Sequence, residues 1–153
     1  MKIDRIQKRA IADLPEHVRL ETQLPATLIH NDFNPRNVAL RRGDDTLRLC
    51  AYDWELARPG LPQHDLAEFL CFVLPANVDR ADVLAFVEFH RIELERASGL
   101  TIPADGWLLG FRLSLVDLLL NRFAMYVMAH RLRRQGFLPR VMKTWASLYR
   151  MFE

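Results

Sequence analysis

The segment from His30 to Asn37 constrains the fold of this chain more than any other, because it concentrates imidazole, carboxylate and amide groups between two apolar runs. Residues 28–29 lead into it and residues 38–40 lead out of it. A polar loop that is held between buried segments is a common place for a binding or catalytic site. We therefore expect residues 30–37 to form a functional loop.

Residues 38–52 contain two short strand-like runs joined by a turn rich in Gly and Asp at residues 42–46, which predicts a β-hairpin. A hairpin returns its second strand beside the first. Asp53, which follows the second run, should therefore lie close to Asn37 and Asp32. The two predicted strands are residues 38–41 and 47–52.

Most of the remaining chain predicts helix. Apolar residues over positions 3–20 are spaced as on one helix face, and Pro15 divides them into one or two short helices. Residues 58–63 hold two prolines and a glycine and predict a loop. Further helices are predicted near residues 65–74, 80–98, 105–134 and 139–151. We expect a mainly α (α+β) fold over residues 1–153, a single domain with one small hairpin and roughly five or six helices.

The composition is that of an ordinary globular protein, with 153 residues, 50% hydrophobic residues and a net charge of +2. The longest apolar run, residues 107–132, is interrupted by charged side chains, so it predicts a buried core helix and no membrane span. Cys50 and Cys71 lie in apolar runs and no secretory signal precedes them, which favours reduced thiols and a cytoplasmic location.

Basic residues gather near the C-terminus, between residues 131 and 150. We interpret them as a solvated face, with a patch for an anionic partner as the alternative, and we expect no nucleic acid partner.

The oxygen-bearing residues of the loop and hairpin suggest magnesium chemistry. Mg²⁺ prefers one or two carboxylates together with substrate phosphates and water, and Asp32, Asn37 and Asp53 offer such ligands. Phosphoryl transfer needs a base that receives a hydroxyl proton, and metal ions that neutralise phosphate charge. The alternative interpretation is that these three residues only cap the loop and its turns, where Asp and Asn are common.

Three motifs together resemble a known family. Residues 30–37 (HNDFNPRN), followed by residues 52–55 (YDWE) and 64–67 (HDLA), resemble the C-terminal lobe of the aminoglycoside phosphotransferase and choline kinase family, in its order and usual spacing. The resemblance covers residues 20–150. It implies a protein-kinase-like fold and an enzyme that uses ATP and Mg²⁺ to phosphorylate a hydroxyl group on a small-molecule acceptor.

The resemblance also implies a role for each matching residue. Asp32 is expected to be the catalytic base, Asn37 a magnesium ligand, and Asp53 the acid that holds the metal against the nucleotide phosphates. His30 is expected to brace the loop. Asp65 is expected to be the buried acid that hydrogen-bonds the loop backbone without touching substrate.

The chain departs from the family pattern in two ways. Asn31 and Arg36 stand where the family commonly has glycine, and Arg36 could reach phosphate or solvent, or could crowd the turn. Only 29 residues precede the motif, so we find no nucleotide-covering N-terminal lobe in the sequence. The chain could be a fragment, could take that lobe from a partner chain, or could be a non-catalytic binding module that acts through a partner or by self-association.

Two further predictions concern polar residues outside the motifs. Asp117 and Asn121 share one face of a long predicted helix, so they could meet the acceptor, or they could pair with other buried polar groups. His64 lacks partners at zinc spacing and is expected to lie at the surface or to cap a helix. Acidic residues that would bind a cationic aminoglycoside are few and scattered, which argues against that acceptor.

Overall fold

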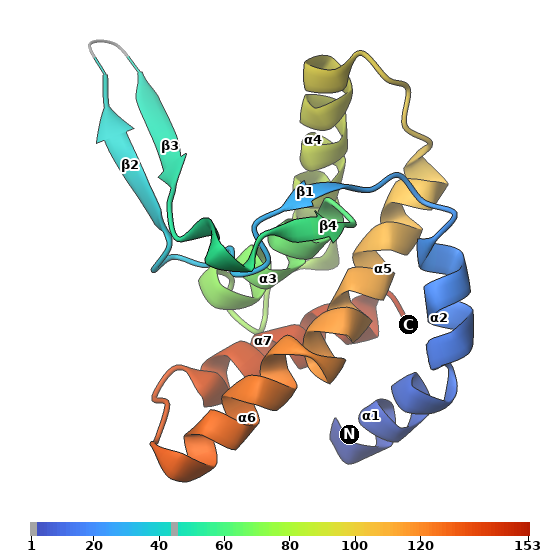
Figure 1. Ribbon diagram of the computed structural model, residues 1–153, viewed down its shortest axis with the longest axis vertical. Helices are drawn as coiled ribbons and strands as arrows, with labels where there is room; N and C mark the ends of the chain where they lie inside the picture. The colour runs from blue at the N-terminus through green and yellow to red at the C-terminus, as the bar shows by residue number, and fades with distance from the viewer. Residues whose placement is uncertain (1–2, 44–45) are drawn as a thin grey trace.

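The computed structural model describes residues 3–43 and 46–153, and in this part of the chain the mainly α prediction is confirmed. Figure 1 shows the helices packed together, with a β-hairpin extending away from them. The elements are α1 (Ile3–Ala12), α2 (Leu14–Glu21), β1 (Thr27–Ile29), β2 (Val38–Arg42), β3 (Leu47–Ala51), the 3₁₀ helix η1 (Trp54–Leu56), β4 (Arg58–Gly60), α3 (Gln63–Val73), α4 (Arg80–Ser98), α5 (Ala104–Leu120), α6 (Arg122–Leu132) and α7 (Leu138–Met151).

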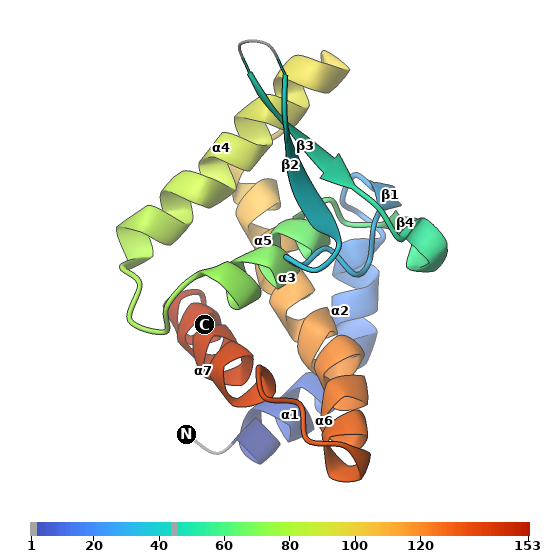
Figure 2. The ribbon, with the colours of Figure 1, turned by 90° about the vertical axis from the view of Figure 1, so that its left-hand side faces the viewer.

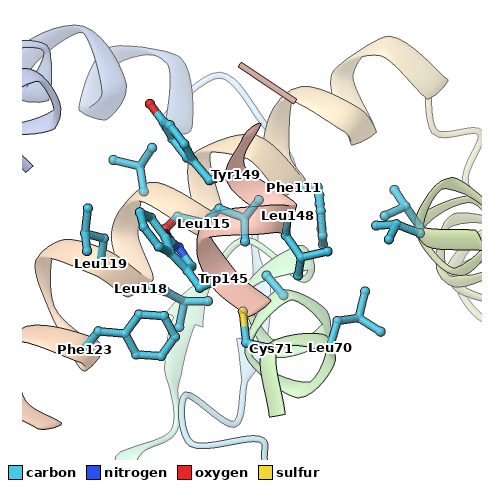
Figure 3. Packing of buried hydrophobic residues seen from close by; sticks show 14 of the residues in the cluster. Leu70, Cys71, Phe111, Leu115, Leu118, Leu119, Phe123, Trp145, Leu148 and Tyr149 are labelled. Atoms are coloured by element: carbon cyan, nitrogen blue, oxygen red, sulfur yellow. Dashed lines mark hydrogen bonds between the residues drawn. The ribbon is translucent and has the colours of Figure 1, made fainter. Parts of the chain in front are cut away.

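Helix α5 is the centre of the hydrophobic core. It packs against α3, α4 and α7, and also against the N-terminal helices α1 and α2. Figure 3 shows the inner part of this core, where Leu115 and Leu118 of α5 lie beside Trp145 and Leu148 of α7. These four side chains are fully buried. At about 25 cal/mol per Å² of buried apolar surface, such burial is the main stabilising contribution to a helical fold.

The close approach of α3 to α5 depends on a glycine. Gly110 of α5 faces Gln63 at the start of α3, and a Cβ atom at position 110 would overlap the Gln63 side-chain amide. Gln63 is buried, and its Nε2 donates a hydrogen bond of 3.1 Å to the carbonyl of Trp107. Because the loop of residues 30–37 is attached to the first turn of α3, this contact helps to fix the loop relative to α5.

The four strands form two separate antiparallel pairs. The predicted hairpin is confirmed, with Val38 opposite Ala51 and Arg42 opposite Leu47; residues 44–45 of its turn lie outside the described residues. Figure 2 shows the hairpin from the side, extending beyond the second pair, β1 with β4. Along the chain, β1 leads directly into the loop of residues 30–37, and β4 leads into α3.

The prediction of a loop over residues 58–63 was wrong for its first half. Residues 58–60 form β4, in which Gly60 lies opposite Thr27 and Arg58 opposite Ile29. A Cβ atom at Gly60 would lie 2.7 Å from Ile29 Cδ1, so the missing side chain lets the strands meet. The backbone pairing of β1 overrides the turn preference of Pro and Gly.

The helix predicted over residues 105–134 is two helices. The backbone turns at Asn121, whose φ of −104° and ψ of −72° depart from helical values, so α5 ends at Leu120 and α6 begins at Arg122. The other helix predictions are close to the structure, and α4 ends as expected at Gly99, which has a φ of 71°. No helix in residues 3–43 and 46–153 is long and apolar enough to cross a membrane.

Candidate functional site

The backbone of the loop at residues 30–37 is held by Asp65 in the first turn of α3. The backbone N–H of His30 donates to Asp65 Oδ2 at 2.7 Å, and that of Asn31 donates to Oδ1 at 2.9 Å. Asn31 adopts a left-handed φ of 61°, a conformation that Asn tolerates better than most residues. Burial acts to raise the pKa of Asp65, but His64 and the two N–H donors outweigh it and lower this pKa.

His30 connects the loop to the end of the hairpin. Its fully buried ring packs 4.7 Å from the ring of Trp54, and its Nε2 lies 2.9 Å from the carbonyl oxygen of Tyr52. The Tyr52 backbone N–H in turn donates to the carbonyl of Asn37 at 3.1 Å. The loop and the residue before Asp53 are therefore joined by hydrogen bonds, as the hairpin prediction required.

Asp32 has a side chain that is mostly buried, with 18% of its surface exposed. Its Oδ1 accepts a hydrogen bond from Asn34 Nδ2 at 2.8 Å, contacts the hydroxyl of Tyr126 at 3.3 Å and forms an ion pair with Arg122. Its Oδ2 accepts one hydrogen bond, from Asn37 Nδ2 at 2.9 Å. Among the described residues, Oδ2 is thus the carboxylate oxygen with spare acceptor capacity.

Asn37 contacts this carboxylate, and Asp53 follows Tyr52, the residue whose backbone bonds to the loop. Asn37 is 7% exposed, and its Nδ2 is directed to both the backbone and the side chain of Asp32. Its Oδ1 receives no hydrogen bond from the described part of the chain. Asp53 is exposed, has a left-handed φ of 68°, and starts the short helix η1. One amide oxygen and one carboxylate are suitable ligands for Mg²⁺, which completes its coordination with phosphate and water.

No cluster of three or more His, Cys, Asp or Glu side chains capable of holding a metal occurs in residues 3–43 and 46–153. The family resemblance implies two magnesium ligands, the amide of Asn37 and the carboxylate of Asp53. Such a site relies on phosphate and water for its other ligands, unlike a metal site whose ligands all come from the protein.

Two residues at this site, Tyr126 and Glu68, were not predicted from the sequence. Arg122 was expected only near Asp117 and Asn121, and its contact with Asp32 was not predicted. Arg122 is the first residue of α6 and is 8% exposed. Its guanidinium pairs with Asp32 at one end, lies 3.5 Å from Glu68 Oε1 through Nε, and lies 5.4 Å from the ring centroid of Tyr126. The available signal was the presence of charged residues in otherwise apolar helices, where a charge is rarely buried without a partner.

Burial raises the pKa values of both Glu68 and Tyr126. Glu68 is completely buried on α3, and burial raises its pKa against the opposing effect of Arg122. Burial likewise raises the pKa of the Tyr126 phenol, so this group remains a hydrogen-bond donor toward Asp32 at neutral pH.

Arg36 lies against the helices and its side chain has defined contacts. Its Nε donates to Asn34 Oδ1 at 3.1 Å, and its guanidinium lies 5.4 Å from the ring centroid of Phe137. A further contact of 3.4 Å reaches the Tyr126 hydroxyl. The backbone carbonyl of Arg36 accepts a hydrogen bond of 2.6 Å from the Tyr52 hydroxyl, so the side chain is accommodated without opening the turn.

The surface or capping location predicted for His64 was wrong. His64 is 4% exposed, with Nε2 3.0 Å from Asp117 Oδ2 and Nδ1 3.9 Å from Asp65 Oδ1. Burial acts to lower its pKa, but the two carboxylates outweigh burial and raise the pKa to about 9. His64 is therefore a buried cation at neutral pH.

Asp117 and Asn121 belong to the same network. Asp117 also pairs with Arg58 at 3.4 Å and accepts a hydrogen bond from Asn121 Nδ2. Burial acts to raise the pKa of Asp117, but His64, Arg58 and Asn121 together lower it.

A cavity of about 360 Å³ lies over this network and reaches Arg122, which pairs with Asp32. Its lining includes Arg58, His64, Asp117 and Asn121, and also Arg122. Asp117 and Asn121 pair with each other, as one of the two predicted alternatives has it, and both line the cavity. Their contact with an acceptor stays a prediction. Three of the side chains that line it are cationic and one is anionic.

Comparison with known proteins identifies the family. The family model described as the phosphotransferase enzyme family matches residues 2–100, well over half of the chain. No curated protein and no solved structure matches the chain. The matched residues include the loop, the hairpin and α3, and end before α5. The chain, with its three motifs and its kinase-like helical fold, belongs to the phosphotransferase enzyme family.

Proposed function

We propose that this chain provides the catalytic lobe of an ATP- and Mg²⁺-dependent phosphotransferase that phosphorylates a hydroxyl group of a small molecule. In this proposal Asp32 accepts the proton of the acceptor hydroxyl. Asn37 and Asp53 hold magnesium and the nucleotide, while His30 and Asp65 maintain the shape of the loop.

The arrangement of the Asp32 carboxylate is the observation that carries the proposal. A general base must present a free acceptor atom in a fixed position. Three groups bind Asp32 Oδ1, whereas Oδ2 accepts one hydrogen bond, from Asn37. The orientation is therefore fixed through Oδ1, and Oδ2 keeps a lone pair for the hydroxyl proton.

The donor chemistry beside Asp32 fits magnesium. Asn37 uses its Nδ2 on Asp32, which leaves its Oδ1 for a cation, and the carboxylate of Asp53 is exposed. When bound, Mg²⁺ would neutralise charge on the phosphates during transfer. The contribution of the chain is to hold Asn37 at the end of the loop and Asp53 just after β3. Tyr52, which lies between β3 and Asp53, bonds to His30 at the start of the loop and to Asn37 at its end.

The lining of the cavity favours a neutral or anionic acceptor over a cationic one. Arg58, Arg122 and protonated His64 line it, against one carboxylate, Asp117. A polycationic acceptor such as an aminoglycoside would meet one carboxylate in this lining, and that carboxylate is already paired with His64 and Arg58.

Transfer of labelled γ-phosphate from ATP to a panel of neutral, anionic and cationic hydroxyl compounds tests the proposal. We expect Mg²⁺-dependent transfer to a neutral or anionic acceptor. Asp32→Asn should lower the rate by about 10²- to 10⁴-fold, the usual contribution of a general base. Calorimetric titration of ATP should show binding that requires Mg²⁺ and is lost in Asp53→Ala.

Asp79→Asn provides the matched control, because Asp79 precedes α4 and its side chain makes no capping hydrogen bond. It should transfer phosphate at the rate of the unmodified protein. Equal rates in the Asp32→Asn and Asp79→Asn variants would contradict the assignment of the base, and ATP binding that ignores Mg²⁺ would contradict the metal site.

A non-catalytic binding module is the second candidate function. The hairpin exposes Leu40, Leu47 and Leu49, each more than half exposed, and clustered apolar side chains of this kind often mark contacts with a partner chain or a second copy. This function predicts a stable complex or self-association in sedimentation experiments, together with no Mg²⁺-dependent binding of ATP in the same calorimetric titration.

A further inference from the structure

Glu68 is a buried charge that the proposed chemistry does not use. It has no exposed surface, and neither of its carboxylate oxygens has a hydrogen-bond partner in the described residues. A buried carboxylate in this condition is costly unless a cation compensates it. The only cationic group in ion-pair range within that part of the chain is Arg122, whose Nε lies 3.5 Å from Oε1.

Arg122 connects this carboxylate to the proposed base. One end of its guanidinium faces Glu68 and the other pairs with Asp32 Oδ1, and the ring of Tyr126 covers it at 5.4 Å. The side chain is 9% exposed, so water has little access to the pair. A planar guanidinium can bridge two carboxylates in fixed directions, which a lysine ammonium cannot do equally well.

We propose that Arg122 is a positioning residue that fixes the Asp32 carboxylate, and that Glu68 is the counter-ion that keeps Arg122 in place. The inference rests on the proposed role of Asp32 as the base. It adds two residues, one of them beyond the segment that the family model matches, to the machinery of that reaction.

The geometry gives a physical reason for this role. Asp32 lies in a loop, and its side chain would otherwise be oriented only by two asparagines of the same loop, Asn34 and Asn37. Arg122 and Tyr126 approach from α6 and hold Oδ1 from the other side. Without this second support, Oδ2 would no longer be directed consistently toward the acceptor. Glu68 is needed because an arginine that is not restrained could move toward the cavity, which it also lines.

Kinetics of four variants of the full chain test the inference. Arg122→Met should lower kcat by about 100-fold and leave KM for ATP nearly unchanged, since misplacement of a reacting group acts on the chemical step. Arg122→Lys should recover about tenfold of that loss by restoring the charge. Glu68→Gln should lower kcat by about tenfold, and the double variant should be no slower than Arg122→Met, because Glu68 acts through Arg122.

The side-chain amides of Asn34 and Asn37 report the position of Asp32 without any catalysis. Both donate to its carboxylate, at 2.8 and 2.9 Å, so their NMR signals should shift and broaden in Arg122→Met. The matched control is Arg131→Met, an exposed position on the same helix, which should leave both the amide signals and kcat unchanged.

The outcomes separate the two proposals. Unmoved amide signals together with an unchanged kcat in Arg122→Met would overturn the positioning role. If the unmodified protein transfers no phosphate, the proposed function fails, and the amide signals still decide whether Arg122 holds Asp32. Arg122→Met could fail to fold because the charge of Glu68 is left uncompensated. In that case the double variant, Arg122→Met with Glu68→Gln, removes the charge, and kcat and the amide signals are measured on it instead. Additive losses in the double variant would contradict the action of Glu68 through Arg122.

Discussion

Two clusters of buried charge, one around His64 and one around Arg122, are built differently. In the His64 cluster, Asp65 accepts two backbone N–H groups, and His64 and Asp117 pair closely. In the Arg122 cluster, Glu68 has no hydrogen bond to any residue that the structure describes, and its cation lies 3.5 Å away while also pairing with Asp32.

Buried charges in this protein therefore have two different effects on the fold. Well-paired charges that bind the backbone determine the shape of the loop, and they contribute to stability. A poorly satisfied carboxylate lowers stability, and such departures from local optimality are concentrated at functional sites. The comparison therefore supports assigning shape to the His64 cluster and the proposed chemistry to the Arg122 cluster.

The largest expected effect is the contrast between removing Asp65 and neutralising Glu68. Asp65→Ala leaves two backbone N–H groups without their acceptor and removes a carboxylate that lies 3.9 Å from His64 Nδ1, so the free energy of unfolding should fall by about 3–5 kcal/mol. Glu68→Gln removes a buried charge without hydrogen bonds and should change this free energy by less than about 1 kcal/mol, or raise it. Urea unfolding followed by circular dichroism measures both, and equal losses would remove the distinction between the clusters.

A pH titration of stability should reveal the His64 cluster. The pKa of His64 is raised from 6.5 to about 9 in the folded protein, so the folded state binds the proton more tightly. This stabilisation is fully present below about pH 6.5 and is lost as the pH rises through about 9, a loss of roughly 3 kcal/mol. Urea unfolding between about pH 6 and pH 10 measures the slope.

His64→Gln should flatten the slope of stability with pH, whereas the control His130→Gln, on α6, should retain it. A slope that survives in His64→Gln would show that another group titrates.

The smallest expected effect concerns Asn121 at the outer edge of the His64 cluster. Asn121 is exposed and donates one hydrogen bond to Asp117, so water can replace it. Asn121→Ala should lower the free energy of unfolding by about 1 kcal/mol. If Asn121→Ala lowered the free energy of unfolding as much as Asp65→Ala does in the same urea experiment, the stability of the cluster would depend on its exposed residue and not on its buried ones.

Local sequence patterns were sufficient for most of the fold. The hairpin follows from a Gly- and Asp-rich turn between strand-like runs, and the end of α4 from Gly99, because both depend on nearby residues. Strand β4 could not be predicted in this way, since its Pro and Gly residues favour a turn and only the distant partner β1 makes it a strand. The break at Asn121 escaped prediction because the apolar pattern continues across it.

The residues of the candidate site likewise fall into those that local sequence predicts and those that depend on tertiary packing. Asp32, Asn37 and Asp53 lie within one loop and hairpin, so the bonds from Asn37 to Asp32 and from Tyr52 to Asn37 follow from short-range structure. Arg122 of α6 reaches Asp32 in the loop and Glu68 on α3 only in the folded protein, and no local pattern encodes these contacts. The burial of His64 likewise depends on α5, which supplies Asp117.

The contact between Tyr126 and Asp32 joins residues 94 positions apart, and it has a consequence for the order of assembly. Contacts of such long sequence separation form late, because the entropy of loop closure opposes them. A nascent chain that has emerged only to residue 100 contains the whole matched segment, yet lacks the groups of α6 that hold Asp32. Docking of α6 then acts as a maturation step, so that the proposed base becomes oriented only in molecules that have completed their helical core.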